Sequence, residues 1–314
     1  MIYLKKILFI NFLFTFLFAE TGAKFLLISP GSKASSLANA QVANSMDAFA
    51  SYWNPASLTN IKKTQFGFVH FKLFPNLSND MYYNFIGFNH QFKKYGNIGG
   101  HLIHLNLGKQ FHMGNDKNEV LGEFYSYMNA FVLSYAYPYS KKISMGINLR
   151  WLHQQLFNIQ LDELNKNANS SNFNIDIAML CKKLYKDINF GITIKNLGSD
   201  IQYSISSEKQ KQPLLVTMGI FSPLFDKNNI SSFIYYDLQY LQPENSINHC
   251  LGIENKLFNQ FLLRTGYYSS NDNNYITWGS GYKINEFNFD FSMILSNSNN
   301  IMNNTMQFSI LYEL

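Results

Sequence analysis

Residues 287–296 read FNFDFSMILS, and this stretch decides the fold. Its odd positions from Phe287 to Leu295 are all apolar, whereas Asn288, Asp290 and Ser292 occupy even positions. Successive side chains of a β-strand point to opposite faces, so this alternation predicts a strand with one apolar and one polar face.

The same alternation recurs from Thr64 to the C-terminus and predicts fourteen strands. Their expected ranges are 64–74, 82–93, 96–107, 127–139, 142–157, 171–182, 186–196, 213–222, 229–241, 247–258, 260–270, 274–284, 286–296 and 303–314. Most ranges have 10–13 residues, near the 9–11 that a tilted strand needs to cross a bilayer. An even strand number is typical of bacterial outer-membrane barrels. We therefore predict an all-β fold, a membrane-spanning antiparallel β-barrel of about 14 strands with an N-terminal plug segment.

The connections between these strands alternate in length. The even-numbered ones are mostly very short, as at 94–95, whereas the odd-numbered ones include the long polar stretches 108–126, 158–170 and 197–212. Outer-membrane barrels have short periplasmic turns and longer extracellular loops. A soluble β-sandwich, the alternative all-β fold, has no reason to sort its loops in this way.

The composition agrees with a barrel and excludes other classes. Charged residues are 14%, against about 25% in an ordinary soluble domain, aromatic residues are 17% and the mean hydropathy is −0.14. So many aromatic residues exclude a disordered chain. Two cysteines, Cys181 and Cys250, cannot make a disulfide scaffold of this length, and 25 Lys+Arg against 20 Asp+Glu leave no dense basic block for nucleic acid.

Residues 1–19, MIYLKKILFINFLFTFLFA, resemble a secretory signal peptide, with Lys5 and Lys6 before an apolar run. Cleavage would follow Ala19 or Ala23, and the alternative is an uncleaved anchor helix. After cleavage we expect the protein in the outer membrane of a Gram-negative bacterium. No later run approaches the roughly 20 apolar residues of a spanning helix.

Residues 20–62 do not alternate and are rich in Ala and Ser. The lumen of a fourteen-stranded barrel is too wide for side chains alone to fill. We therefore expect residues 20–62 to form a plug, and residues 63–314 to form the barrel. The alternative for the whole segment is a loose periplasmic tail. For Asn54-Pro55-Ala56 alone, the alternative is a simple turn that leads into the first strand.

Charged residues within the expected strands fall on the face opposite the apolar row. They are Arg150, Asp176, Lys195, Glu254, Arg264 and Asp290. An Arg or Lys at the lipid midplane costs about 2–4 kcal/mol, so these side chains should face the lumen. They could grip the plug or line a substrate path, or they could simply pair with one another.

The sequence offers no catalytic, metal or cofactor site. His101 and His104 would point to opposite faces of one strand, and Gly279-Ser280-Gly281 continues as a strand rather than forming a nucleophile elbow. No phosphate-binding or dinucleotide motif occurs, and an enzyme is a minor alternative. The long loops carry three apolar residues that could contact partners, namely Phe111, Phe124 and Tyr203.

Several segments resemble the PorV/PorQ family of the FadL-like outer-membrane barrels. The N-terminal signature is carried by residues 22–26, 30–34 and 52–56, in particular by Phe25, Leu26, Pro30, Gly31, Trp53, Asn54, Pro55 and Ala56. Further similarity lies at 133–136, 196–198, 252–254 and 264–267. The chain departs from the family pattern at Lys33, where an Arg is usual, and at 38–39, near the usual Gly-Gly pair.

This resemblance implies a fourteen-stranded barrel with an N-terminal plug that works in the type IX secretion system. Such proteins engage the C-terminal signal domains of exported cargo, so the implied partners are lipid, cargo signal domains and other secretion-system proteins. FadL-like relatives instead pass hydrophobic compounds through the outer membrane, and this remains the alternative. A structural membrane protein without a transport role is a third possibility.

Overall fold

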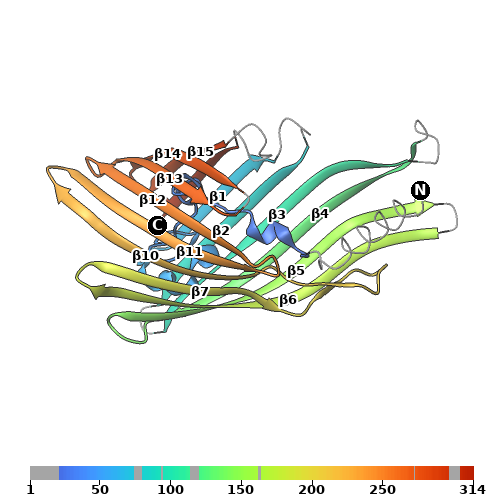
Figure 1. The fold of residues 1–314 in the computed structure, drawn as a ribbon, viewed down its shortest axis with the longest axis horizontal. Coiled ribbons are helices and arrows are strands. Elements are labelled where there is room, and N and C mark those ends of the chain that lie inside the picture. Colours follow the sequence, from blue (N-terminus) through green and yellow to red (C-terminus); the bar gives the residue numbers. More distant parts are fainter. Residues whose placement is uncertain are drawn as a thin grey trace, which may run out of the picture.

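The computed structural model describes residues 21–73, 80–92, 95–113, 120–161, 164–271, 273–296 and 305–314. These residues form a closed antiparallel β-barrel of fourteen strands (Figure 1). The predicted fold is confirmed, while the expected signal peptide at 1–19 lies outside the described residues. No described helix is long and apolar enough to cross a membrane.

The barrel strands follow one another around the wall, and β1 closes the barrel against β16. They are β1 (Gln65–Lys72), β2 (Tyr82–Phe92), β3 (Gly96–Met113), β4 (Val120–Tyr137), β5 (Ile143–Leu161), β6 (Leu164–Tyr185), β7 (Ile188–Gly198), β10 (Leu214–Lys227), β11 (Ile230–Gln242), β12 (Ser246–Leu257), β13 (Phe261–Ser269), β14 (Asn274–Ile284), β15 (Phe287–Ser296) and β16 (Met306–Glu313). Two short strands, β8 (Ile201–Gln202) and β9 (Lys209–Gln210), form a separate hairpin between β7 and β10.

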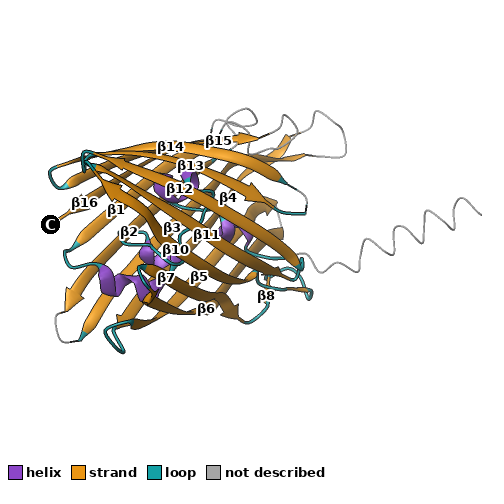
Figure 2. Ribbon diagram, turned by 60° about the vertical axis from the view of Figure 1, so that its left-hand side comes forward, coloured by secondary structure: helices purple, strands orange, loops and turns teal. Residues whose placement is uncertain are grey.

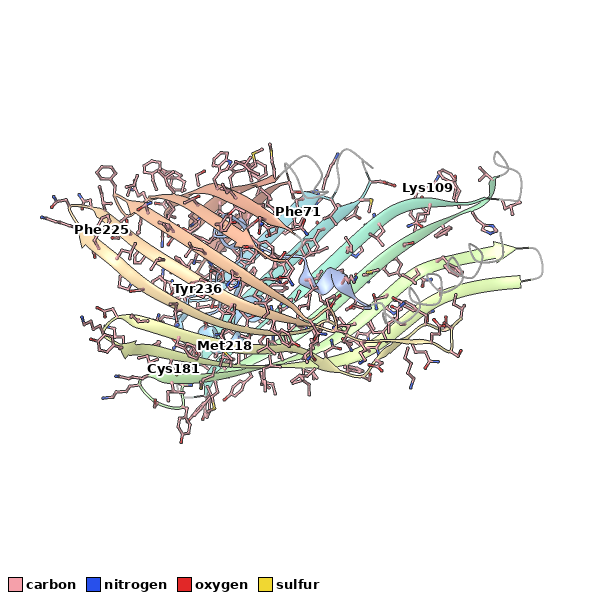
Figure 3. The ribbon with its side chains drawn as sticks, in the orientation of Figure 1. Phe71, Lys109, Cys181, Met218, Phe225 and Tyr236 are labelled. Atoms are coloured by element: carbon pink, nitrogen blue, oxygen red, sulfur yellow. The ribbon has the colours of Figure 1, made fainter. Side chains whose placement is uncertain are left out.

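Alternating side chains give the barrel an apolar outer surface. In β15, Phe287 and Phe289 are exposed while Ser292 is buried. The strand register extends this surface sideways, since Phe68, Ile86 and Leu102 lie opposite one another on successive strands and all are exposed. Exposed apolar rows of this kind form the lipid-facing band of a membrane barrel. Figure 3 shows the side chains that stand on this surface, among them Met218 on β10.

Strands β3 to β6 are longer than predicted. Most of the expected loops at 108–126 and 158–170 belong to these strands, so those loop assignments are wrong, and the expected loop at 197–212 contains β8 and β9. Lipid no longer dictates which residues are apolar beyond the membrane, so the alternation on which the prediction rested fades there. The four long strands rise past the ends of their neighbours at the end of the barrel opposite the short turns (Figure 1). That end is the extracellular one, because short turns are periplasmic.

Residues 21–61 fill the lumen. They form the short helices η1 (Lys24–Leu27), α2 (Ser32–Ser36), α3 (Ala50–Trp53) and η2 (Pro55–Asn60), which Figure 2 shows inside the barrel. The segment starts at the outer mouth, where the Gly22 N–H donates to the Lys211 carbonyl (2.9 Å) and the Thr21 hydroxyl donates to Glu244 (2.6 Å). It ends near the periplasmic turns, where Thr59 donates to Ser144 (2.8 Å). We call residues 21–61 the plug.

Glycines on the barrel wall allow the plug to approach closely. A Cβ at Gly191 of β7 would lie 2.3 Å from the carbonyl oxygen of Val42, and one at Gly146 of β5 would lie 2.2 Å from the Ala56 nitrogen. Any side chain at these positions would push the plug away. Gly146 and Gly191 therefore mark two places where plug backbone touches the wall.

Candidate functional site

Two aromatic residues of the plug tie its first part to its second. The Tyr52 hydroxyl donates to the Leu26 carbonyl (2.9 Å), and the Trp53 indole N–H donates to the Pro30 carbonyl (3.2 Å). Phe25, Leu26, Tyr52 and Trp53 are all buried in one apolar cluster, which continues into the wall through Phe85. The residues of the N-terminal signature thus hold the plug in a compact shape by contacts within it.

The Asn54-Pro55-Ala56 turn joins α3 to η2. Asn54 accepts the Ala56 N–H (2.9 Å) and its amide donates to the Val42 carbonyl (2.7 Å), so one side chain caps a helix and links two plug segments. Pro55 occupies the first turn of η2, where its missing N–H costs nothing. Gly31 has φ of +94°, a conformation that favours glycine, and packs against Phe49.

Arg150 and Asp176 form a buried ion pair in the lumen. The Arg150 guanidinium contacts both carboxylate oxygens of Asp176, at 3.1 and 2.5 Å, and also donates to Asn196 (2.5 Å). Asn148 then joins this pair to the plug, because its amide donates both to Asp176 (2.8 Å) and to the Ser51 carbonyl (2.8 Å). Three strands, β5, β6 and β7, meet in this cluster.

A second, separate ion-pair cluster lies on β12, β13 and β15. Arg264 donates to Glu254 (2.6 Å) and to Asp290 (2.5 Å), and Glu254 also accepts from the Tyr235 hydroxyl (3.1 Å). Glu254 and Arg264 are direct cross-strand partners in the register. The six charged residues predicted to face the lumen are all on the inner side, but the structure groups five of them into these two clusters.

Lys195 stands apart from both clusters. Its ammonium donates to the Tyr52 carbonyl (3.2 Å) and lies 4.2 Å from the centre of the Tyr52 ring and 5.5 Å from that of Trp53. Cation–π contacts of this kind stabilise an ammonium that has left water. Lys195 forms no ion pair within 4.0 Å among the described residues.

Sequence reasoning missed Asp237, which is the main anchor for the middle of the plug. Its carboxylate accepts the backbone N–H groups of Gln41 (2.7 Å) and Val42 (2.9 Å). Thr277 adds a similar contact by accepting the Ala38 N–H (3.2 Å). The alternation that predicted the other lumen residues could have found it, because Asp237 lies on the strand face opposite the outward-facing Leu238.

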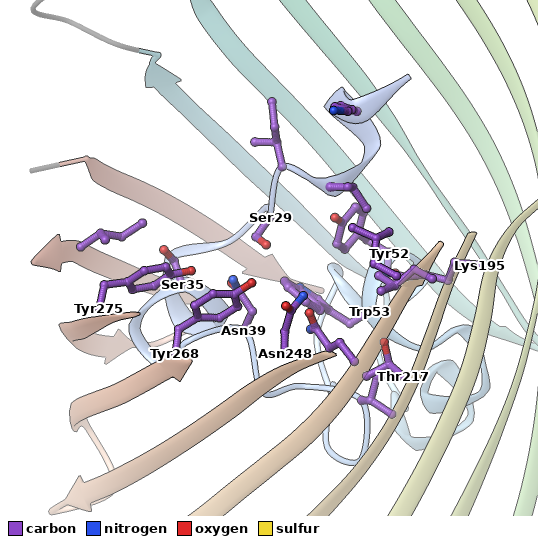
Figure 4. A pocket seen from close by; sticks show the side chains of 18 of the residues that line it. Ser29, Ser35, Asn39, Tyr52, Trp53, Lys195, Thr217, Asn248, Tyr268 and Tyr275 are labelled. Atoms are coloured by element: carbon purple, nitrogen blue, oxygen red, sulfur yellow. The ribbon is translucent and has the colours of Figure 1, made fainter. Parts of the chain in front are cut away.

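A cavity of about 280 Å³ lies between the plug and the wall (Figure 4). Aromatic rings of Tyr52, Trp53, Tyr268 and Tyr275 line it, together with the Lys195 ammonium. A second cavity of about 370 Å³ lies on the periplasmic side of the plug, beside the Arg264 cluster. Both cavities include plug residues in their walls, so the plug stands between the two ends of the lumen.

The three apolar residues expected in extracellular loops occupy different environments. Phe111 lies on β3 and is 52% exposed, whereas Phe124 lies on β4 and packs edge-on against Phe157 at 6.1 Å. Tyr203, between β8 and β9, packs against the apolar cluster of the plug, and its partial burial raises the pKa of its phenol. Only Phe111 is therefore an exposed candidate for a partner contact.

In the described ranges, no group of three His, Cys, Asp or Glu residues could hold a metal ion. His101 faces the lumen and bonds Ser51 (2.8 Å), while His104 faces outward and bonds Asn129 (2.7 Å). Cys181 and Cys250 are both free cysteines.

The architecture places the chain among the plugged, fourteen-stranded outer-membrane barrels. The toluene transporter TbuX of Ralstonia pickettii has a similar structure, with a TM-score of 0.67 at 14% identity, covering 92% of this chain and 99% of that one. The toluene transporter TodX of Pseudomonas putida follows with a TM-score of 0.59 at 10% identity (91% and 98% covered). A Pseudomonas aeruginosa FadL homologue gives 0.51 at 8% identity (91% and 99% covered).

The sequence itself gives the family. A family model described as type IX secretion system protein PorV matches residues 18–238, which is more than half of the chain. The chain therefore belongs to this family, and it is an outer-membrane barrel of the type IX secretion system, as the resemblance predicted. No curated protein matches it. The family and the fold are those of secretion or transport barrels rather than of enzymes.

Proposed function

We propose that this barrel receives the C-terminal signal domains of exported proteins at its extracellular end and passes these proteins on for attachment to the cell surface. The observation that carries the proposal is the family match over residues 18–238, a range that includes the plug and all four long strands. Cleavage of the N-terminal signal peptide would precede this role.

The position of the plug favours binding of the passenger at the outer surface of the barrel over its passage through the lumen. Its backbone is bonded to the wall by Asp237 on β11, by Asn148 on β5 and by Thr277 on β14, which lie on different sides of the barrel. A folded passenger cannot pass a lumen filled in this way. The surfaces that remain for a passenger are those of the long strands β3 to β6 outside the membrane.

The test is deletion of the gene followed by a census of surface and secreted proteins. We expect proteins with type IX signal domains to leave the surface and accumulate in the periplasm, and the wild-type gene to restore them. Unchanged surface proteins in the deletion strain would overturn the proposal.

The cavity beside Lys195 supports a second candidate function, the uptake of hydrophobic compounds. Its aromatic lining and the buried Lys195 ammonium suit a small amphiphilic molecule. The substitution Asn248→Phe would fill this cavity from β12. If the barrel serves secretion, Asn248→Phe restores surface proteins in the deletion strain as well as the wild type does; if it serves uptake, the variant fails to restore growth on a hydrophobic compound that the parent strain consumes.

A further inference from the structure

Two periplasmic turns of the barrel carry a concentration of positive charge. They join β4 to β5 and β6 to β7, and with the adjoining end of β6 they contain five lysines and one aspartate, namely Lys141, Lys142, Lys182, Lys183, Lys186 and Asp187. The described turns from β10 to β15 mix charges of both signs, since Lys227, Lys256 and Lys283 there accompany Asp226 and Glu286. We call the five clustered lysines the basic rim.

The two turns lie side by side, which brings like charges together. The Lys182 N–H donates to the Lys142 carbonyl (2.7 Å), and this bond continues the register of β5 with β6. Lys142 and Lys182 are therefore direct cross-strand neighbours, and like charges in this position destabilise a sheet. In the part of the chain that the structure describes, Lys183 alone of the basic rim forms an ion pair, with Asp187 (3.2 Å). The chain thus gathers four ammonium groups without supplying a counter-charge for them.

The wall places the basic rim at the level of the lipid headgroups. On the outer face of β6, Phe173, Ile175 and Ile177 are exposed and belong to the lipid-facing band. Cys181 lies beyond them toward the periplasm (Figure 3), and Lys183 follows Cys181 along the chain. The apolar band of a membrane barrel spans the hydrocarbon layer, so charged residues directly after it meet the headgroups.

Exposed aromatic side chains accompany these lysines. Tyr139, in the same turn as Lys141, is 68% exposed, and Tyr185, at the end of β6, is 65% exposed. The Lys186 ammonium lies 5.4 Å from the centre of the Tyr185 ring. Aromatic residues form a girdle at each interface of an outer-membrane barrel, and lysines beside an interface extend their ammonium groups to the headgroups. The basic rim and its tyrosines therefore have the composition of a lipid-binding surface.

We infer that the basic rim binds the headgroup of an anionic phospholipid in the periplasmic leaflet of the outer membrane. The negative headgroup supplies the counter-charge that Lys142 and Lys182 lack, and the acyl chains lie along the apolar outer face of β6. An acidic periplasmic protein could also supply negative charge. The exposed rings of Tyr139 and Tyr185 and the adjoining lipid-facing band favour the lipid.

Two triple variants separate the basic rim from the overall charge of the barrel. The rim variant is Lys141→Gln/Lys142→Gln/Lys186→Gln, and the matched control, Lys62→Gln/Lys227→Gln/Lys283→Gln, removes three charges from other periplasmic segments. Each full barrel is placed in nanodiscs of equimolar phosphatidylcholine and phosphatidylglycerol, and native mass spectrometry counts the lipids of each kind that stay bound. We expect wild type and control to retain phosphatidylglycerol preferentially. In the rim variant this preference should fall at least about fivefold, the effect of one lysine near an anionic surface.

The single variant Lys142→Gln gives an independent measurement with opposite signs in two membranes. In vesicles of phosphatidylcholine it relieves the repulsion with Lys182, so the urea midpoint of unfolding should rise above that of wild type. In vesicles of the equimolar mixture it removes a contact with the anionic headgroup, so the midpoint should fall below that of wild type.

Three results would overturn the lipid site. If the rim variant retains phosphatidylglycerol as wild type does, an acidic protein becomes the better partner for the basic rim. If the control loses the preference equally, the overall charge of the barrel attracts the lipid and the basic rim does not. A midpoint of Lys142→Gln that shifts in the same direction in both membranes would also contradict the inference.

Discussion

The Arg150 cluster and Asp237 both place an ionisable side chain in the lumen, but their structural roles differ. Arg150 and Asp176 neutralise each other within the wall, and only the neutral Asn148 reaches the plug. Asp237 has no cation within ion-pair distance among the described residues and instead accepts two N–H groups of the plug. The first arrangement belongs to the barrel, whereas the second exists only when the plug is in place.

This difference separates the stability of the wall from the retention of the plug. A substitution in the Arg150 cluster should lower the stability of the barrel wall. A substitution at Asp237 should weaken the attachment of the plug inside an intact barrel. Two measurements distinguish these effects. Urea unfolding of the barrel measures the stability of the wall. Ion conductance through a planar bilayer shows whether the plug still closes the lumen.

The largest effect is expected for Arg150→Ala. Removal of the guanidinium leaves the buried Asp176 carboxylate without its partner, which costs about 3–5 kcal/mol. Urea unfolding should show a correspondingly lower free energy of unfolding. The double variant Arg150→Ala/Asp176→Ala is the control, and it should recover part of the loss because no unpaired charge remains. A double variant that is no more stable than the single one would contradict this explanation.

Asp237→Ala should have a smaller effect, located in the plug. Two backbone N–H groups lose their carboxyl acceptor, and a typical hydrogen bond contributes about 0.5–1.5 kcal/mol net. We expect conductance to rise several-fold, with little change in the unfolding of the wall. Asp237→Asn, which keeps one oxygen acceptor, should lie between Asp237→Ala and wild type. If the wall unfolds as easily as in Arg150→Ala, the distinction between the two sites is wrong.

Gly191→Val tests the close approach of the wall to the plug. The new side chain would overlap the Val42 carbonyl, so the plug must shift at a cost of about 1–3 kcal/mol. Conductance should increase here as well. Gly122→Val is the matched control, since a Cβ at Gly122 meets no atom within 4 Å. Equal conductance of the two variants would show that the contact at Gly191 does not hold the plug.

The smallest effect is expected for Trp53→Phe. The aromatic packing largely persists, but the bond from the indole to the Pro30 carbonyl is lost, at about 0.5–1.5 kcal/mol. We expect slightly higher conductance and no change in wall stability. Tyr52→Phe removes the equivalent bond to Leu26 and should behave in the same way. An effect as large as that of Asp237→Ala would mean that the plug is held mainly by its own internal contacts.

The strands were predictable within the membrane, where contact with lipid requires apolar and polar residues to alternate. They were less predictable outside it. The predicted range 274–284 coincides with β14, whereas the ends of β5 and β6 outside the membrane were taken for a loop. The alternation of polar and apolar residues along its strand placed Arg264 in the lumen. The partners of Arg264 depend on the register between strands, which this alternation does not give. The role of Asp237 depends on where the plug lies, and no strand pattern contains that information.

The path of the plug sets an order on how the molecule can be assembled. Thr21 is held at the extracellular end and Thr59 near the periplasmic turns, so the chain runs the length of the lumen before β1 begins. Once β1 has paired with β16, Thr21 could reach the extracellular end only by threading through the closed lumen, which the plug fills. The seam must therefore close around a segment that is already in place, and the plug acts as the template on which the barrel is completed.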